Sequence, residues 1–67
     1  MESKLHSFYL ARAADSERAA EAATLANVRE RHLVAALTWT DLATRTGRVE
    51  SMRTRITAEK QAERAAE

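Results

Sequence analysis

The sequence predicts an all-α fold: an antiparallel helical hairpin with a long second helix. Strong helix formers dominate the 67 residues, with 15 Ala, 9 Arg, one Gly and no Pro. Residues typical of strands are sparse. Apolar side chains also recur every seven residues, the spacing of a helix that packs along one side. These side chains form the apolar row: Val28, Ala35, Leu42, Val49 and Ile56.

Composition limits the chain to one small domain, 1–67, and excludes several classes of protein. With no Cys, it has neither a disulfide framework nor a thiolate metal site. A formal net charge of +1 argues against an obligate polyanion binder. The longest apolar run, 33–37, is far shorter than the ~20 residues that span a bilayer. We therefore expect a cytoplasmic protein without membrane association.

The first helix is expected over about 4–23. Ser3 or Ser7 can cap it, because a Ser oxygen accepts hydrogen bonds from unpaired first-turn N–H groups. Its inner face is bulky at the N-terminal end and small toward the C-terminal end. That face comprises Leu5, Tyr9, Arg12, Ser16, Ala19 or Ala20, and Ala23, with Phe8 and Ala13 beside it. We expect Arg12 either to extend along the surface or to pair with Asp41 or a partner chain.

The turn is expected at 24–27, where Thr24 or Asn27 can cap the next helix. Neither Gly nor Pro marks this turn, so one unbroken helix through 23–28 is the alternative. The second helix is expected over about 25–62, with a frayed tail at 63–67. Gly47 could end it and start a third helix at Arg48. A continuous helix is favoured, because the apolar row passes through Gly47 unbroken and an interior Gly costs only about 1 kcal/mol.

An antiparallel hairpin brings together positions whose numbers sum to about 48 or 49. Small residues then face medium-sized ones near the turn, and Tyr9 faces Trp39 at the open end, a ring pair of the kind that stabilises interfaces. The predicted hairpin core is Leu5, Phe8, Tyr9, Val28, His32, Ala35, Trp39 and Leu42.

The second helix extends well beyond the first, so the first helix can cover only the N-terminal half of the apolar row. Val49, Met52 and Ile56 lie where the first helix cannot cover them. Leu33 and Leu37 lie off the core face. They are either harmless surface residues or, with Leu10 and Ala14, a second apolar surface. The candidate partner interface is therefore Leu33, Leu37, Val49, Met52 and Ile56. We expect a homo-oligomer, with a dimeric four-helix bundle favoured.

No pattern in the sequence indicates catalysis, a cofactor or a metal site. His6 and His32 are far apart, and neither has a second ligand at helical spacing. His32 is expected at the hairpin interface, bonded to Ser16 or to the backbone. The chain therefore predicts a non-enzyme with no catalytic, cofactor-binding or metal-binding residues.

The favoured function is that of a self-associating adaptor or regulator, which presents a helical surface to a second copy or to another protein. The alternative is a small nucleic-acid-binding regulator that uses the basic segment 45–55, with Arg45, Arg48, Arg53 and Arg55. These four side chains point in several directions, and Glu50 interrupts them, so this alternative is less favoured. A membrane-surface helix is the weakest interpretation, because the tail is strongly charged.

Three stretches carry a resemblance to known proteins. They are Tyr9-x-x-Arg12-Ala13, the segment 19–24 (Ala-Ala-Glu-Ala-Ala-Thr), and the segment 28–43, which contains Val28-Arg29-x-x-His32-Leu33 and Trp39-x-x-Leu42-Ala43. Over residues 9–43 the chain resembles a group of short, uncharacterised proteobacterial helical-hairpin proteins. That group often has Asp-Pro in its turn, where this chain has Leu25-Ala26. The resemblance implies a cytoplasmic helical hairpin and no particular activity.

Overall fold

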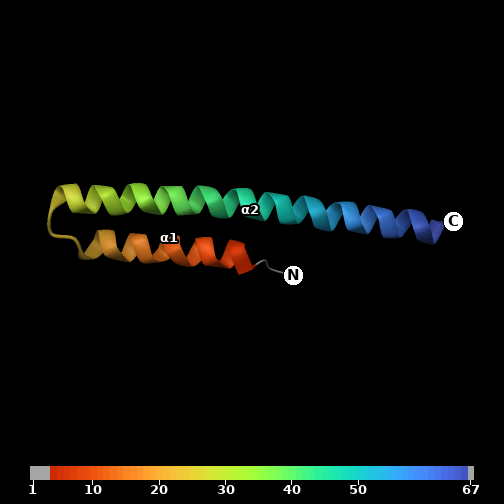
Figure 1. Cartoon of the computed structure of the whole chain (residues 1–67), viewed down its shortest axis with the longest axis horizontal. Helices are drawn as coiled ribbons and strands as arrows, with labels where there is room; N and C mark the ends of the chain where they lie inside the picture. Colours follow the sequence, from red (N-terminus) through yellow and green to blue (C-terminus); the bar gives the residue numbers. More distant parts are fainter. Residues whose placement is uncertain (1–3, 67) are drawn as a thin grey trace.

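Two antiparallel helices, α1 (Lys4–Ala22) and α2 (Ala26–Ala66), make up the molecule (Figure 1). The computed structural model describes residues 4–66. The all-α hairpin predicted from the sequence is confirmed. The rod measures 64 × 14 × 12 Å, and α2 alone sets its length, since its 41 residues span about 62 Å at 1.5 Å per residue. The 19 residues of α1 span only about 28 Å and cover the first half of α2.

Helix boundaries differ from the prediction mainly at the C-terminal end. The helix α2 continues to Ala66, so residues 63–66, which were expected to fray, are helical. Ala, Glu, Lys and Arg all favour a helix, which explains the extension. Ser7 lies inside α1 and does not cap it, and Ser3 and Glu67 lie outside the described residues.

Gly47 is an interior residue of α2, as predicted, and does not end the helix. No residue of the described range 4–66 has a positive φ. The backbone at Gly47 therefore follows the ordinary right-handed helical path. The reason for a Gly at this position lies in the side chain packed against it, described below.

The turn spans residues 23–25, which rules out an unbroken helix. The carbonyl of Leu25 accepts the first hydrogen bond of α2, from the Arg29 N–H at 3.0 Å. Leu25 therefore occupies the N-cap position that had been predicted for Thr24 or Asn27. The Arg29 guanidinium donates to the carbonyl of Ala23 at 3.1 Å, just past the end of α1. An Arg side chain thus bonds to the first carbonyl after α1, at a position where many helices have a Gly.

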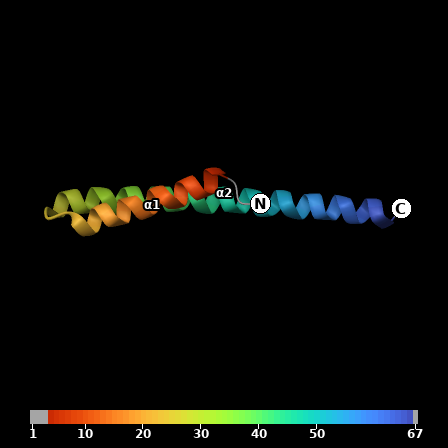
Figure 2. The ribbon, with the colours of Figure 1, turned by 90° about the horizontal axis from the view of Figure 1, so that it is seen from below.

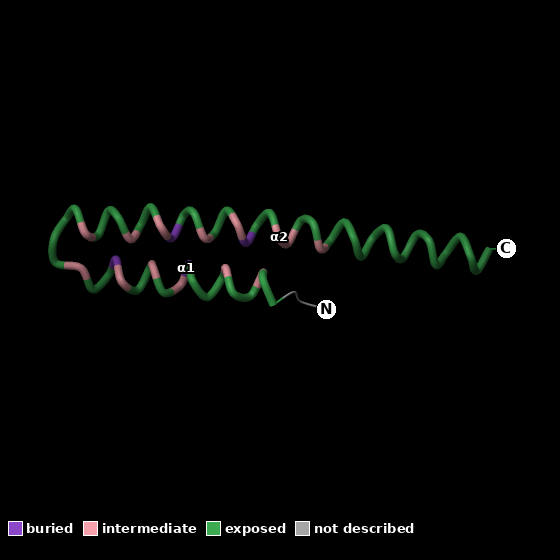
Figure 3. The backbone as a smooth tube through the Cα atoms, in the orientation of Figure 1, coloured by how far each residue is buried: buried purple, intermediate pink, exposed green. Residues whose placement is uncertain are grey.

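The core of the hairpin consists of alanines. Among residues 4–66, four side chains are buried, and all are Ala at a spacing of seven within each helix: Ala13, Ala20, Ala36 and Ala43. We call this set the Ala seam. Small side chains let two helices approach closely, because the distance between helix axes depends on the residues at the contact. Buried and half-buried positions of α1 and α2 face each other along the seam, and burial ends midway along α2 (Figure 3).

The apolar row lies beside the Ala seam, not at its centre. Ala35 and Leu42 each precede a seam residue by one position and are half-buried, as is Val28. One residue corresponds to a rotation of about 100° around a helix, so the row faces the edge of the hairpin. A view along a second direction shows α1 crossing α2 at a shallow angle (Figure 2).

The predicted core residues divide into two groups. Six of them are half-buried beside the seam: Tyr9, Val28, His32, Ala35, Trp39 and Leu42. Leu5 and Phe8 are each 50% exposed, so their assignment to the core is wrong. The prediction paired the helices through their largest apolar side chains. The helices instead meet through Ala13 and its seam partners, which turns Leu5 and Phe8 toward the edge.

Candidate interaction surface

Aromatic side chains pack around Trp39 near the open end of the hairpin. The ring centroid of Tyr9 lies 5.8 Å from that of Trp39, as the register predicted. The Phe8 ring meets Trp39 edge-on at 6.0 Å. The Arg12 guanidinium lies over the Trp39 ring, 5.3 Å from its centroid, in a cation–π contact. Arg12 therefore packs on an aromatic ring. Of the alternatives open for it, the pair with Asp41 does not form, because Asp41 pairs with Arg45.

His6 is an interface residue that sequence reasoning missed. Its Nδ1 donates a hydrogen bond to the carbonyl of Ala43 at 2.8 Å. Its ring also lies over Gly47, where an added Cβ would be 3.2 Å from the ring Cε1. A signal for this position exists, since His6 precedes Ala13 and Ala20 at the seven-residue spacing of the seam. His6 was not predicted at the interface, because the core was assigned mainly from large apolar residues.

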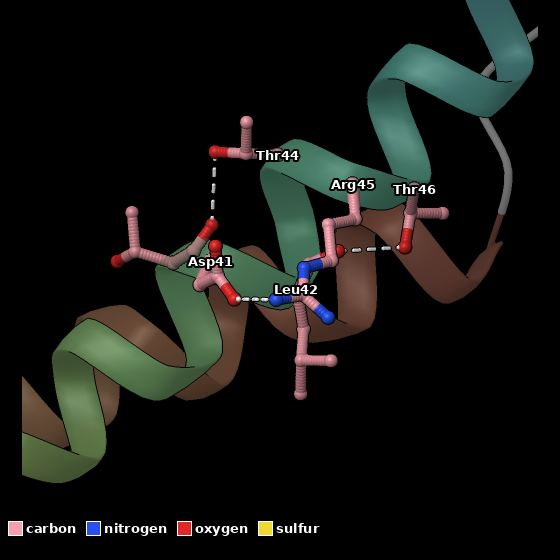
Figure 4. A network of polar contacts seen from close by, with 6 residues as sticks. Asp41, Leu42, Thr44, Arg45 and Thr46 are labelled. Carbon is pink, nitrogen blue, oxygen red and sulfur yellow. Dashed lines mark hydrogen bonds and ion pairs between the residues drawn. The ribbon is translucent and has the colours of Figure 1, made fainter.

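Polar side chains just before Gly47 bond within α2 (Figure 4). Thr44 and Thr46 donate from their hydroxyls to the carbonyls of Thr40 and Leu42, at 3.0 and 2.8 Å. Asp41 pairs with Arg45 at 3.0 Å, one helical turn away, which explains why Asp41 does not meet Arg12.

The C-terminal part of the apolar row lies on the segment of α2 that extends past α1. Every residue from 51 to 66 is exposed, and we call this segment the overhang. Val49, just before it, is 49% exposed, and Met52 and Ile56 within it are 63% and 44% exposed. As predicted, α1 does not cover these side chains.

Leu5 and Phe8 lie on the same side of the hairpin as the apolar row. Leu5 precedes His6 by one position, just as Leu42 precedes Ala43. In an antiparallel pair, residues one position before the seam on each helix share one side. The contact of Phe8 with Trp39 is consistent with this placement. We call the resulting surface the row face; it comprises Leu5, Phe8, Leu42, Val49, Met52 and Ile56.

On the opposite side of the hairpin, the apolar surface is less continuous than on the row face. Leu10, Leu33 and Leu37 are exposed there, with Leu37 the most exposed at 71%. A hollow of about 530 Å³ is lined by Glu17, Ala20, Glu21, Arg29 and Leu33. Charged side chains border Leu33 in this hollow, so the apolar area is interrupted.

The predicted basic segment does not form one patch. Arg45 is paired with Asp41. Arg48 and Arg55 are two turns apart and line one shallow hollow with Thr44, Ser51 and Met52. Arg53 precedes Arg55 by two residues and therefore points about 160° away from it.

Within residues 4–66, no group of three or more His, Cys, Asp or Glu side chains is placed to hold a metal ion. No helix in the same range is long and apolar enough to cross a membrane. No protein-family model, curated protein or solved structure matches this chain significantly. The arrangement of the residues themselves is therefore the basis for a functional proposal.

Proposed function

We propose that this chain is a non-catalytic helical module that self-associates through its row face, as an adaptor or regulator built on a dimer. The observation that carries the proposal is the exposure of Val49, Met52 and Ile56 on the part of α2 that α1 does not reach. A second copy is the partner that the chain itself supplies.

Exposed apolar area on the overhang favours a partner. Covering a large apolar side chain contributes about 1.5–3 kcal/mol relative to leaving it in water. Val49, Met52 and Ile56 recur at the three- and four-residue spacing of one helix face, so one partner helix can cover all three. Scattered surface apolar residues would not offer such a continuous strip.

The weakness of the hairpin core also favours a partner. Its buried side chains are alanines, which remove little apolar area from water. Small domains bury a low fraction of their surface and are marginal without added support. Every residue of the overhang is exposed, and isolated helices of about 15 residues are marginal in water. Dimerisation would stabilise both parts together.

His6 and two of the carboxylates are engaged in structural contacts, which is consistent with a non-catalytic role. His6 bonds to a backbone carbonyl. Asp15 pairs with Arg18 and Asp41 pairs with Arg45, both on exposed helix surface. Such pairs contribute less than about 1 kcal/mol and leave the carboxylates solvated.

Ile56→Asp tests the proposal, with Ser51→Asp as its matched control. Both changes add one carboxylate to the overhang, but Ser51 lies off the row face. We expect light scattering to give twice the 7.5 kDa chain mass for the unmodified protein and for Ser51→Asp. Ile56→Asp should give the monomer mass, because a charge would be buried against apolar side chains. A stable, folded monomer for the unmodified chain at micromolar concentration would contradict the proposal.

Nucleic-acid binding is the second candidate, favoured by the placement of Arg48 and Arg55 beside the Thr44 and Ser51 hydroxyls. Phosphate contacts of this type weaken steeply with salt. The rival role predicts that DNA is retarded at low salt and that Arg48→Glu with Arg55→Glu abolishes the retardation. An absence of retardation at low salt excludes it.

A further inference from the structure

We infer that two copies pair antiparallel along the whole of α2, so that each overhang becomes the third helix of the other copy's hairpin. This inference rests on the proposed self-association and specifies its geometry. The partner is a second copy of this chain, and the contact is the row face.

Helix lengths fit this arrangement. Each α2 has a first half that α1 covers and a second half that is bare. When two such helices run antiparallel, the bare half of one lies along the covered half of the other. The overhang spans about 24 Å and α1 about 28 Å, so each end of the assembly becomes a bundle of three helices of similar length.

The apolar row sets the register of the pair. The two core positions of a heptad alternate along each helix. In an antiparallel pair, each residue at one of these positions lies opposite a residue at the other position on the partner helix. A register in which paired residue numbers sum to about 94 places Leu42 opposite the partner's Met52. It also pairs α2 over nearly its entire length, from Val28 to Ala66.

The same register adds contacts to the exposed parts of Leu5 and Phe8. Because α1 is antiparallel to its own α2, it runs parallel to the α2 of the second copy. With hairpin pairs that sum to about 49, as for His6 and Ala43, Leu5 then lies within one residue of the level of the partner's Val49. Phe8 lies within one residue of the level of the partner's Met52. All four positions are about half exposed or more in the single chain. The arrangement therefore covers Leu5 and Phe8, which are half exposed in the single hairpin.

One pair of opposite charges meets in this register. Arg31 lies opposite the partner's Glu63, since their numbers sum to 94. A parallel pairing would instead set Glu59 against the partner's Glu59 and Glu63 against the partner's Glu63. Like charges placed directly across an interface are unfavourable. Charge thus favours the antiparallel pair over the parallel one.

Cysteine cross-linking tests the geometry without competing thiols, since the chain has no Cys. Thr38→Cys and Ile56→Cys are made in separate chains. Thr38 is opposite the partner's Ile56 in the proposed register, whereas two copies of either single position are about 27 Å apart along the rod. We expect disulfide-linked dimer on oxidation of the equimolar mixture and little in either variant alone.

Each other outcome has a definite meaning. Covalent dimer in the Thr38→Cys or Ile56→Cys sample alone would show a parallel pair and overturn the inference. No covalent dimer in any sample, with the unmodified chain dimeric by sedimentation equilibrium, would overturn the register while leaving the proposed function intact. A monomeric unmodified chain would overturn the proposed function itself.

Discussion

At the scale of single residues, the contact between His6 and Gly47 explains why the one Gly of the chain stands inside a helix. The His6 imidazole donates to the Ala43 carbonyl, one turn before Gly47. A methyl group at Gly47 would meet this ring at 3.2 Å, closer than ordinary van der Waals contact. The interior Gly costs about 1 kcal/mol of helix stability and leaves space for the imidazole.

Gly47→Ala should therefore stabilise the chain more strongly when His6 is absent. In the His6→Ala background we expect a gain of about 1 kcal/mol, the difference in helix propensity between Gly and Ala. In the unmodified background the gain should be smaller, because the new methyl presses on the imidazole. Urea unfolding of the four chains at one protein concentration measures this coupling. Equal gains in both backgrounds would show that His6 and Gly47 are energetically independent.

Residue-level prediction succeeded where large side chains decide the contact. The Tyr9–Trp39 ring pair follows from register and size alone. His6 and Arg29 were missed, because their role is a hydrogen bond to a main-chain carbonyl. Any segment of helix offers such acceptors, so the sequence carries little signal for them. Arg12 was placed on the correct face, but its contact with Trp39 depends on the side-chain geometry.

At the scale of the helices, the Ala seam decides how closely α1 and α2 approach. Counting large apolar residues picked out the apolar row, which lies one residue away from the seam. Ala is ambiguous in a sequence with 15 of them, since it favours helices anywhere and also fills tight contacts. The element boundaries were predicted to within a few residues, because they depend on helix propensity.

Enlarging a seam residue should be costly, whereas enlarging an outer Ala should not. We expect Ala13→Leu to destabilise the hairpin by about 1–3 kcal/mol, because three added carbons have no space between the helices. Ala11→Leu makes the same chemical change two residues away on an exposed position, and should lie within about 0.5 kcal/mol of the unmodified chain. Thermal unfolding followed by circular dichroism compares the two. Similar losses for both variants would place the seam elsewhere on α1.

At the scale of the whole molecule, the mismatch in helix length is the dominant feature. A 19-residue helix cannot cover a 41-residue one, and this follows from the sequence once the turn is located. The sequence also placed Val49, Met52 and Ile56 on the uncovered part. The helix lengths alone do not say what would cover them, because the register of a proposed partner depends on the shape of the row face, including Leu5 and Phe8.

Hydrogen exchange of the overhang amides tests the central claim most directly, since a bare helix opens far more easily than a packed one. With a second copy bound, amides of residues 52–60 should be protected nearly as well as those of residues 32–46. This protection should fall as the protein is diluted, by mass action. Rapid exchange over residues 52–60 at every concentration, with residues 32–46 protected throughout, would contradict the claim that a second copy covers the overhang.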